Sequence, residues 1–137
     1  MANRYSQEPL LMEKIIASLS YIIPWIGFIW LLLSFFMKRN LKPFLQYHIY
    51  QALFLAFGLF LLSIFLGLVM NILSYIPVLN IIVMHLSYLF NTPLLFGFSI
   101  IELFVFSVLI YLAITSFQGK YSYLPWVSNI IKANVRG

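Results

Sequence analysis

Long runs of uncharged residues constrain this chain more than any other feature of its sequence. Residues 15–37 and 44–70 contain no Asp, Glu, Lys or Arg, and residues 94–117 contain only Glu102 of these types. As helices these runs would each extend about 35 to 40 Å, enough to cross a hydrocarbon core of about 30 Å. Charged residues make up 8% of the chain, whereas soluble proteins carry roughly 25%. The sequence therefore predicts an all-α integral membrane protein.

Prolines and short polar motifs mark where the predicted helices end. Pro24 lies inside the first run and should kink it. Pro77 predicts the end of the second helix, because the residue before a proline avoids the helical conformation. Asn91 or Thr92, ahead of Pro93, is a candidate N-cap for the last helix.

The segment between these breaks is ambiguous. Residues 78–90 would cover only about 20 Å as a helix, which is too short for the hydrocarbon core. A helix over residues 73–90, kinked at Pro77, could barely cross. Otherwise this segment is re-entrant or lies at the membrane interface.

Small residues share a face on each of the first two predicted helices. Such faces allow another helix to approach closely. The residues are Ser20, Pro24, Gly27 and Ser34 in the first helix, and Ala52, Ala56, Ser63 and Gly67 in the second. His48 lies on the second stripe at about 100° per residue, so it should face protein rather than lipid.

A dense polar segment precedes and opens the second predicted helix. Three cations form a tight basic loop, and four polar side chains follow on the first helical turns: Gln46, Tyr47, His48 and Gln51. His48 has two interpretations, an interfacial histidine bonded to backbone or lipid headgroup, or a polar contact that fixes this helix against another helix or a partner subunit. The basic loop favours phospholipid anchoring over recognition of a specific ligand. The candidate membrane-surface anchors of the chain are Lys38, Arg39, Lys42, Lys120, Trp126 and Lys132.

The end of the chain, residues 118–137, reads as an interfacial tail. Residues 125–132 predict a short amphipathic helix on the membrane surface. Tyr121, Tyr123 and Trp126 fit the aromatic belt that forms at a membrane boundary.

Glu102 is expected near the middle of the last span. A charged acid there costs about 2.5–3.5 kcal/mol on insertion scales, so an intramembrane acid generally has a partner or a function. One interpretation is a proton or ion relay, or a polar lining of a substrate path. The other is a protonated glutamate hydrogen-bonded to a Tyr, Ser or His on a neighbouring helix. Glu102 shares a face with Ser99 and Ser116, so it should face protein.

No motif for chemistry appears. The sequence has no phosphate-binding loop, which excludes an ATP-driven pump for this chain alone, and no dinucleotide fingerprint or nucleophile elbow. It has no cysteine, and two histidines with one buried acid specify no metal site. We therefore predict no enzyme activity, no catalytic residue, no metal and no cofactor. The net charge of +5 comes from cations at the ends of apolar runs, which indicates membrane anchoring rather than nucleic-acid binding.

Two stretches together resemble a known family. The first is Pro-Phe-Leu-Gln-Tyr-His-Ile-Tyr-Gln-Ala-Leu at residues 43–53. The second is Asn91-Thr92, followed after a span by Gly-Lys-Tyr-Ser-Tyr-Leu-Pro at residues 119–125 and then Ser128. They resemble the twenty-kilodalton Tic subunit family, the small membrane subunit of the protein translocon at the chloroplast inner envelope, with cyanobacterial and plastid-encoded relatives. The resemblance covers roughly residues 15–135. Gln46 stands where that family usually has an arginine.

The resemblance implies a single four-helix transmembrane domain over residues 1–137. Its spans would lie at about 15–37, 44–70, 73–90 and 94–117, with the third short or kinked. Loop charges by themselves mildly favour three spans with the N-terminus outside, but we adopt four.

The implied role is preprotein translocation across a plastid inner envelope, or a related role in a cyanobacterial plasma membrane. The implied partners are the lipid bilayer, other membrane subunits and preproteins, and a homo-oligomer is a further arrangement. A bundle this small has no room for a polypeptide-wide pore, so a path would need oligomers or partner subunits. The alternatives from the residues are a small secondary transporter or ion pathway using Glu102, and a membrane scaffold or assembly protein.

Overall fold

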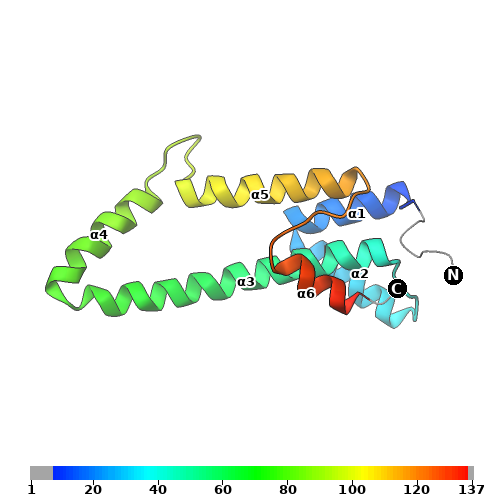
Figure 1. The fold of residues 1–137 in the computed structure, drawn as a ribbon, viewed down its shortest axis with the longest axis horizontal. Coiled ribbons are helices and arrows are strands. Elements are labelled where there is room, and N and C mark those ends of the chain that lie inside the picture. The colour runs from blue at the N-terminus through cyan, green and yellow to red at the C-terminus, as the bar shows by residue number, and fades with distance from the viewer. Residues whose placement is uncertain (1–7, 136–137) are drawn as a thin grey trace. The chain divides into compact units, whose positions relative to one another are not determined.

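The computed structural model describes residues 8–135, and every regular element in that range is a helix (Figure 1). The predicted all-α class is therefore confirmed. The helices are α1 (Leu11–Ile22), α2 (Pro24–Phe36), α3 (Pro43–Ser74), α4 (Pro77–Asn91), α5 (Ile100–Phe117) and α6 (Val127–Asn134).

Two of these helices, α3 and α5, are long and apolar enough to cross a membrane. The core helix of a soluble protein can also be this apolar, but it is mostly buried. In the most apolar 18-residue windows of α3 and α5, 0% and 11% of the residues are buried. Length, composition and exposure therefore suggest a membrane location.

The first predicted span is two helices rather than one. Ile23, between α1 and α2, has extended backbone angles (φ −127°, ψ 94°), and Pro24 is the first residue of α2. Proline fits this position because its missing N–H needs no partner there. The expected kink at Pro24 is thus a complete break, and neither α1 nor α2 by itself reaches the length of a span.

Helices α3 and α4 meet where the sequence placed a boundary. Helix α3 ends at Ser74, and α4 begins at Pro77 after an extended Ile76. Helix α4 contains 15 residues, which corresponds to about 22 Å. It is an apolar helix shorter than a perpendicular span.

The last predicted span begins later than expected, at Ile100 instead of residue 94. Residues 94–99 form a tight turn with an isolated antiparallel bridge between Leu95 and Phe98 and positive φ at Phe96 and Gly97. The expected cap is also wrong. Thr92 is the C-cap of α4, and its hydroxyl donates to the carbonyl of Tyr88.

The described chain divides into two compact units. The first contains residues 8–57 and 109–135, and the second contains residues 58–108. The single transmembrane domain over the chain stays a prediction.

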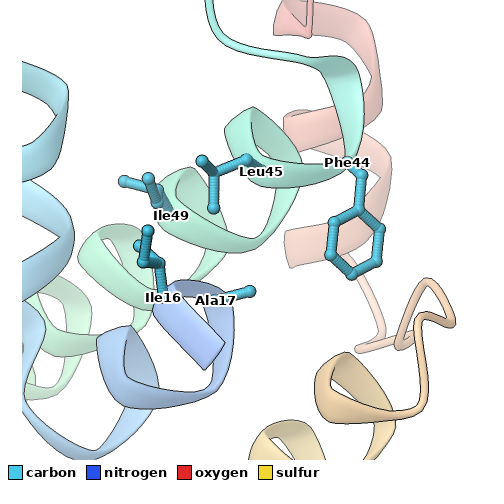
Figure 2. Close-up of a cluster of buried hydrophobic side chains, with 5 residues drawn as sticks. All are labelled: Ile16, Ala17, Phe44, Leu45 and Ile49. Carbon is cyan, nitrogen blue, oxygen red and sulfur yellow. The ribbon is translucent and has the colours of Figure 1, made fainter. Parts of the chain in front are cut away.

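The core of the first unit lies between α1 and the beginning of α3. Ile16 and Ala17 of α1 pack against Phe44, Leu45 and Ile49 of α3, and all five are buried (Figure 2). Burying an aliphatic or aromatic side chain of this size stabilises a fold by about 1.5–3 kcal/mol in water. The cluster therefore fixes α1 against the first turns of α3.

At Gly27, helix α2 lies close to α1 and α3. A Cβ atom at this glycine would lie 2.7 Å from the Oγ of Ser20 and 3.3 Å from the Cγ2 of Ile49. Ser20 is fully buried, and its hydroxyl donates to the carbonyl of Ile16, so it has little freedom to move away. The predicted small-residue face is thus a close helix contact at this residue.

We expect Gly27→Ala to destabilise the protein by about 1–3 kcal/mol, because the added methyl overpacks a tight contact. Thermal unfolding in detergent, followed by circular dichroism, measures this effect. Gly58→Ala is the matched control, since a Cβ at Gly58 meets nothing within 4 Å. Equal stability of the two variants would contradict the tight contact at Gly27.

Candidate functional site

The start of α3 is fixed by contacts from the basic loop before it. The N–H of Arg39 donates to the carbonyl of Ser34, and Lys38 adopts a left-handed conformation (φ 50°) that ends α2. The Gln46 side chain donates from Nε2 to the carbonyl of Leu41 at 2.9 Å. Lys42 Nζ lies 3.1 Å from Glu13 Oε1, so this cation also ties the loop to α1.

The end of α5 is shaped by Gly119. The N–H of Gly119 donates to the carbonyl of Ser116, and the N–H of Lys120 donates to that of Thr115. These bonds form a Schellman motif, which requires a left-handed residue and therefore favours glycine. Gly119 has φ 77°, and a Cβ there would lie 2.9 Å from Cε of Lys14. The turn directs the chain back over α1 and places the Lys120 carbonyl beside α3.

Helix α6 packs on the start of α3. Trp126 precedes α6 with a positive φ of 65°, and the Ser128 hydroxyl accepts from the N–H of Leu124 at 2.7 Å. The buried side chains of Ile131 and Val135 contact Tyr47. Helix α6 accordingly lies against the start of α3 (Figure 1). The structure thus contains the expected short helix and also places one face of it on protein.

Six buried side chains from these segments form a polar node, defined as Tyr21, Tyr47, His48, Gln51, Ser122 and Ser128. Tyr47 donates to the carbonyl of Ser122 and also lies 2.9 Å from Ser128 Oγ. Gln51 contacts Ser128 Oγ through Nε2 at 3.1 Å and Ser122 Oγ through Oε1 at 3.2 Å. The node therefore joins α3 to α6 and to the segment that follows α5.

His48 and Tyr21 extend the node to α1. The Tyr21 hydroxyl lies 2.7 Å from His48 Nδ1 and 2.7 Å from Gln51 Oε1. On its other side, His48 Nε2 lies 3.0 Å from the carbonyl of Lys120. His48 therefore combines a contact to another helix, through Tyr21, with a contact to a backbone carbonyl, and so has a feature of each of its two interpretations.

The hydrogen-bond donors and acceptors around His48 indicate the protonation state of its ring. The Lys120 carbonyl can only accept, so Nε2 carries a proton. If Tyr21 donated to the Gln51 oxygen alone, Nδ1 would have to donate to Tyr21, and His48 would be a cation. Burying an unpaired cation is costly, and the nearby acid Glu13 is already paired with Lys42. We therefore assign a neutral ring, with the Tyr21 hydroxyl as donor to both acceptors at 2.7 Å, His48 Nδ1 and Gln51 Oε1.

Aromatic rings enclose the histidine. Tyr121 stacks on His48 with centroids 6.0 Å apart, and Phe44 meets it edge-on at 4.5 Å. Within residues 8–135, no buried side-chain nitrogen or oxygen lacks a hydrogen-bond partner. Over the same residues, no three metal-ligating side chains come together. The polar groups of the node thus pair with one another and join four segments: α1, α3, the segment after α5 and α6.

The other candidate packing positions differ in their surroundings. Ala52 is buried and Ala56 is half-buried in the first unit. Ser63 and Gly67, further along the predicted stripe, are exposed, and a Cβ at Gly67 would meet nothing within 4 Å. The stripe on α3 is therefore covered at its start and uncovered beyond it.

The predicted membrane-surface anchors are mostly exposed. Lys42 is the exception, because it is half-buried and paired with Glu13. The exposed ones are Lys38, Arg39, Lys120, Trp126 and Lys132. Their contact with lipid stays a prediction.

The predicted position of Glu102 is wrong. This residue lies in the first turn of α5, not at mid-helix. Its Oε2 accepts from the N–H of Ser99 at 2.8 Å, and the Ser99 hydroxyl accepts from the N–H of Glu102 at 3.4 Å. This reciprocal pair is a capping box, in which the carboxylate also interacts favourably with the helix dipole. Glu102 is exposed rather than facing protein as expected, and its partner is this local cap instead of the neighbouring-helix partner of one of its two interpretations.

Three members of the node were not candidates from the sequence. Tyr21 lies within an apolar run and carries no pattern that separates it from other tyrosines. Ser122 and Ser128 belong to the residues that carry the family resemblance, so that stretch was the available signal.

We expect Tyr47→Phe to destabilise the protein by about 1–3 kcal/mol, because Ser122 and Ser128 lose a buried hydrogen-bonding partner. The tail should also become more sensitive to proteolysis, since Tyr47 joins it to α3. Thermal unfolding and limited proteolysis in detergent measure the two effects. Tyr88→Phe removes the same atom from a side chain that is 74% exposed. If both variants behave alike, the node does not hold the tail.

No protein-family model matches the chain, and neither a curated protein nor a solved structure gives a match.

Proposed function

We propose that this protein is a multi-pass membrane subunit of a protein translocon, of the twenty-kilodalton Tic subunit type. One observation carries the proposal. The two stretches that resemble this family, residues 43–53 and 119–128, lie far apart in the sequence, yet they supply most of the polar node. The residues that carry the resemblance therefore contact one another in the fold.

Four spans are part of this proposal. Helices α3 and α5 have the required length. The first span would combine α1 and α2 across the break at Ile23, and the third would be α4, tilted or in a locally thinned bilayer. The exposed apolar side chains of α2 and α4, such as Phe35, Val78 and Met84, suit a lipid environment.

The proposed role is assembly and transport rather than catalysis. A bundle of this size cannot enclose an aqueous path for a polypeptide, so partner subunits or further copies would complete it. The uncovered part of the α3 stripe is a surface where such a helix could pack. Small residues drive helix association in membranes because they allow backbones to approach closely.

The first test is a native pull-down of the tagged protein from mild detergent, with identification of the bound proteins. We expect a stoichiometric complex with other membrane subunits and arrested preproteins. Recovery as a monomer would contradict the proposal and favour a scaffold protein with no obligate partner. Gly67→Leu should reduce the yield of the complex severalfold. The large side chain would stand on the uncovered stripe and keep the backbone of a partner helix at a distance. Val78→Leu, which enlarges a side chain 72% exposed on α4, is the control.

Glu102→Gln separates this proposal from a transporter that uses Glu102 for protons. Glutamine can also serve in a capping box, so we expect unchanged complex formation and a change in stability within about 0.5 kcal/mol. Complex yield and proton flux in reconstituted vesicles measure the two alternatives. Loss of a proton-coupled flux with an intact complex would support the transporter.

A further inference from the structure

A pocket lies beside the polar node, between the start of α3 and helix α6. It has a volume of about 410 Å³ and is lined by Tyr47, Tyr121, Lys132 and Val135. This volume is within the range of about 300–1,000 Å³ that is usual for small-molecule sites. These four lining residues, all within the part of the chain that the structure describes, belong to the first unit.

The pocket lining combines an apolar surface with one positive charge. The Tyr47 hydroxyl is engaged by Ser122 and Ser128, so Tyr47 contributes ring carbon to the pocket rather than a free donor. Val135 adds an aliphatic surface. Lys132 supplies a positive charge, and its Nζ lies 5.8 Å from the centroid of the Tyr123 ring. No acidic residue follows Glu102 in the sequence, so neither the tail nor α6 carries an acid that would neutralise this cation.

The place of the pocket in the fold suits a molecule from the membrane. Tyr47 is in the second turn of α3, the longest candidate span. The exposed cations Lys38 and Arg39 lie in the loop just before this helix. Basic residues at the end of a span mark the headgroup level of a bilayer. A lipid could therefore reach the pocket without leaving the membrane.

We propose that this pocket binds an anionic phospholipid. The phosphate pairs with the Lys132 ammonium, and the first part of an acyl chain lies against the Tyr47 ring and Val135. A peptide would fit poorly, because its backbone amides would be buried against an apolar wall without partners. Free phosphate would gain nothing from that wall. The inference needs a membrane location but not the translocon role, so either proposal can fail by itself.

The test counts lipids that remain bound to the purified full chain in native mass spectrometry. The probes are dioleoylphosphatidylglycerol and dioleoylphosphatidylcholine, which have the same chains and differ in net charge. We expect the wild-type protein to retain the anionic lipid preferentially. Lys132→Gln should weaken its binding about tenfold, the loss expected for one charge-assisted contact. Inorganic phosphate should not displace it.

Lys38→Gln is the matched control, because it removes one exposed cation that does not line the pocket. Val135→Trp is a second variant. It is expected to weaken the binding of both lipids, because the larger side chain would fill the apolar part of the pocket. Helix content and elution volume confirm that each variant is folded. Equal retention of the two lipids, an equal loss in Lys38→Gln and Lys132→Gln, or displacement by phosphate would each overturn the proposal.

Discussion

The requirement that buried polar groups be paired organises the first unit of this protein. His48 and Gln51 are completely buried at the start of α3, where no water can satisfy them. Their partners come from α1, from the segment after α5 and from α6. If any of these segments moved away, it would leave unpaired groups in an apolar setting, at a cost of about 1–3 kcal/mol each. The node therefore couples the tail to the helices.

Backbone geometry at the ends of helices makes this pairing available. Gly119 ends α5 in a left-handed turn, which brings the Lys120 carbonyl to His48. Trp126 is the central residue of a γ-turn before α6 (φ 65°, ψ −51°), closed by the bond from the N–H of Val127 to the carbonyl of Pro125, and it is 82% exposed. A bulky residue in this conformation costs of order 1–3 kcal/mol. The packing of Ile131 and Ser128 beyond it compensates for that strain.

The tail is consequently part of the fold and not a free arm. Its buried face contacts Tyr47, and its exposed face carries Trp126 and Lys132. The node and the apolar contacts of Ile131 and Val135 with Tyr47 together hold α6 against α3 beside the pocket. The predicted membrane anchors of the tail and the proposed lipid site thus depend on contacts that also fix the helices.

The prolines predicted the boundary at Pro77 and a kink at Pro24, which is a complete break in the structure. Hydrophobic patterning determined the helical class, because helix formation and burial depend on local backbone and solvation preferences. It misplaced the start of α5, since an apolar run does not mark where a helix begins inside it. The Ser99-Ile100-Ile101-Glu102 capping box was readable in the sequence and would have located that start. The orientation of His48 toward protein also followed from helical periodicity. Its partners did not, because Tyr21 and Lys120 lie 27 and 72 residues away. Only the tertiary structure decides which distant polar groups meet, since that choice is made by packing and pairing across the chain.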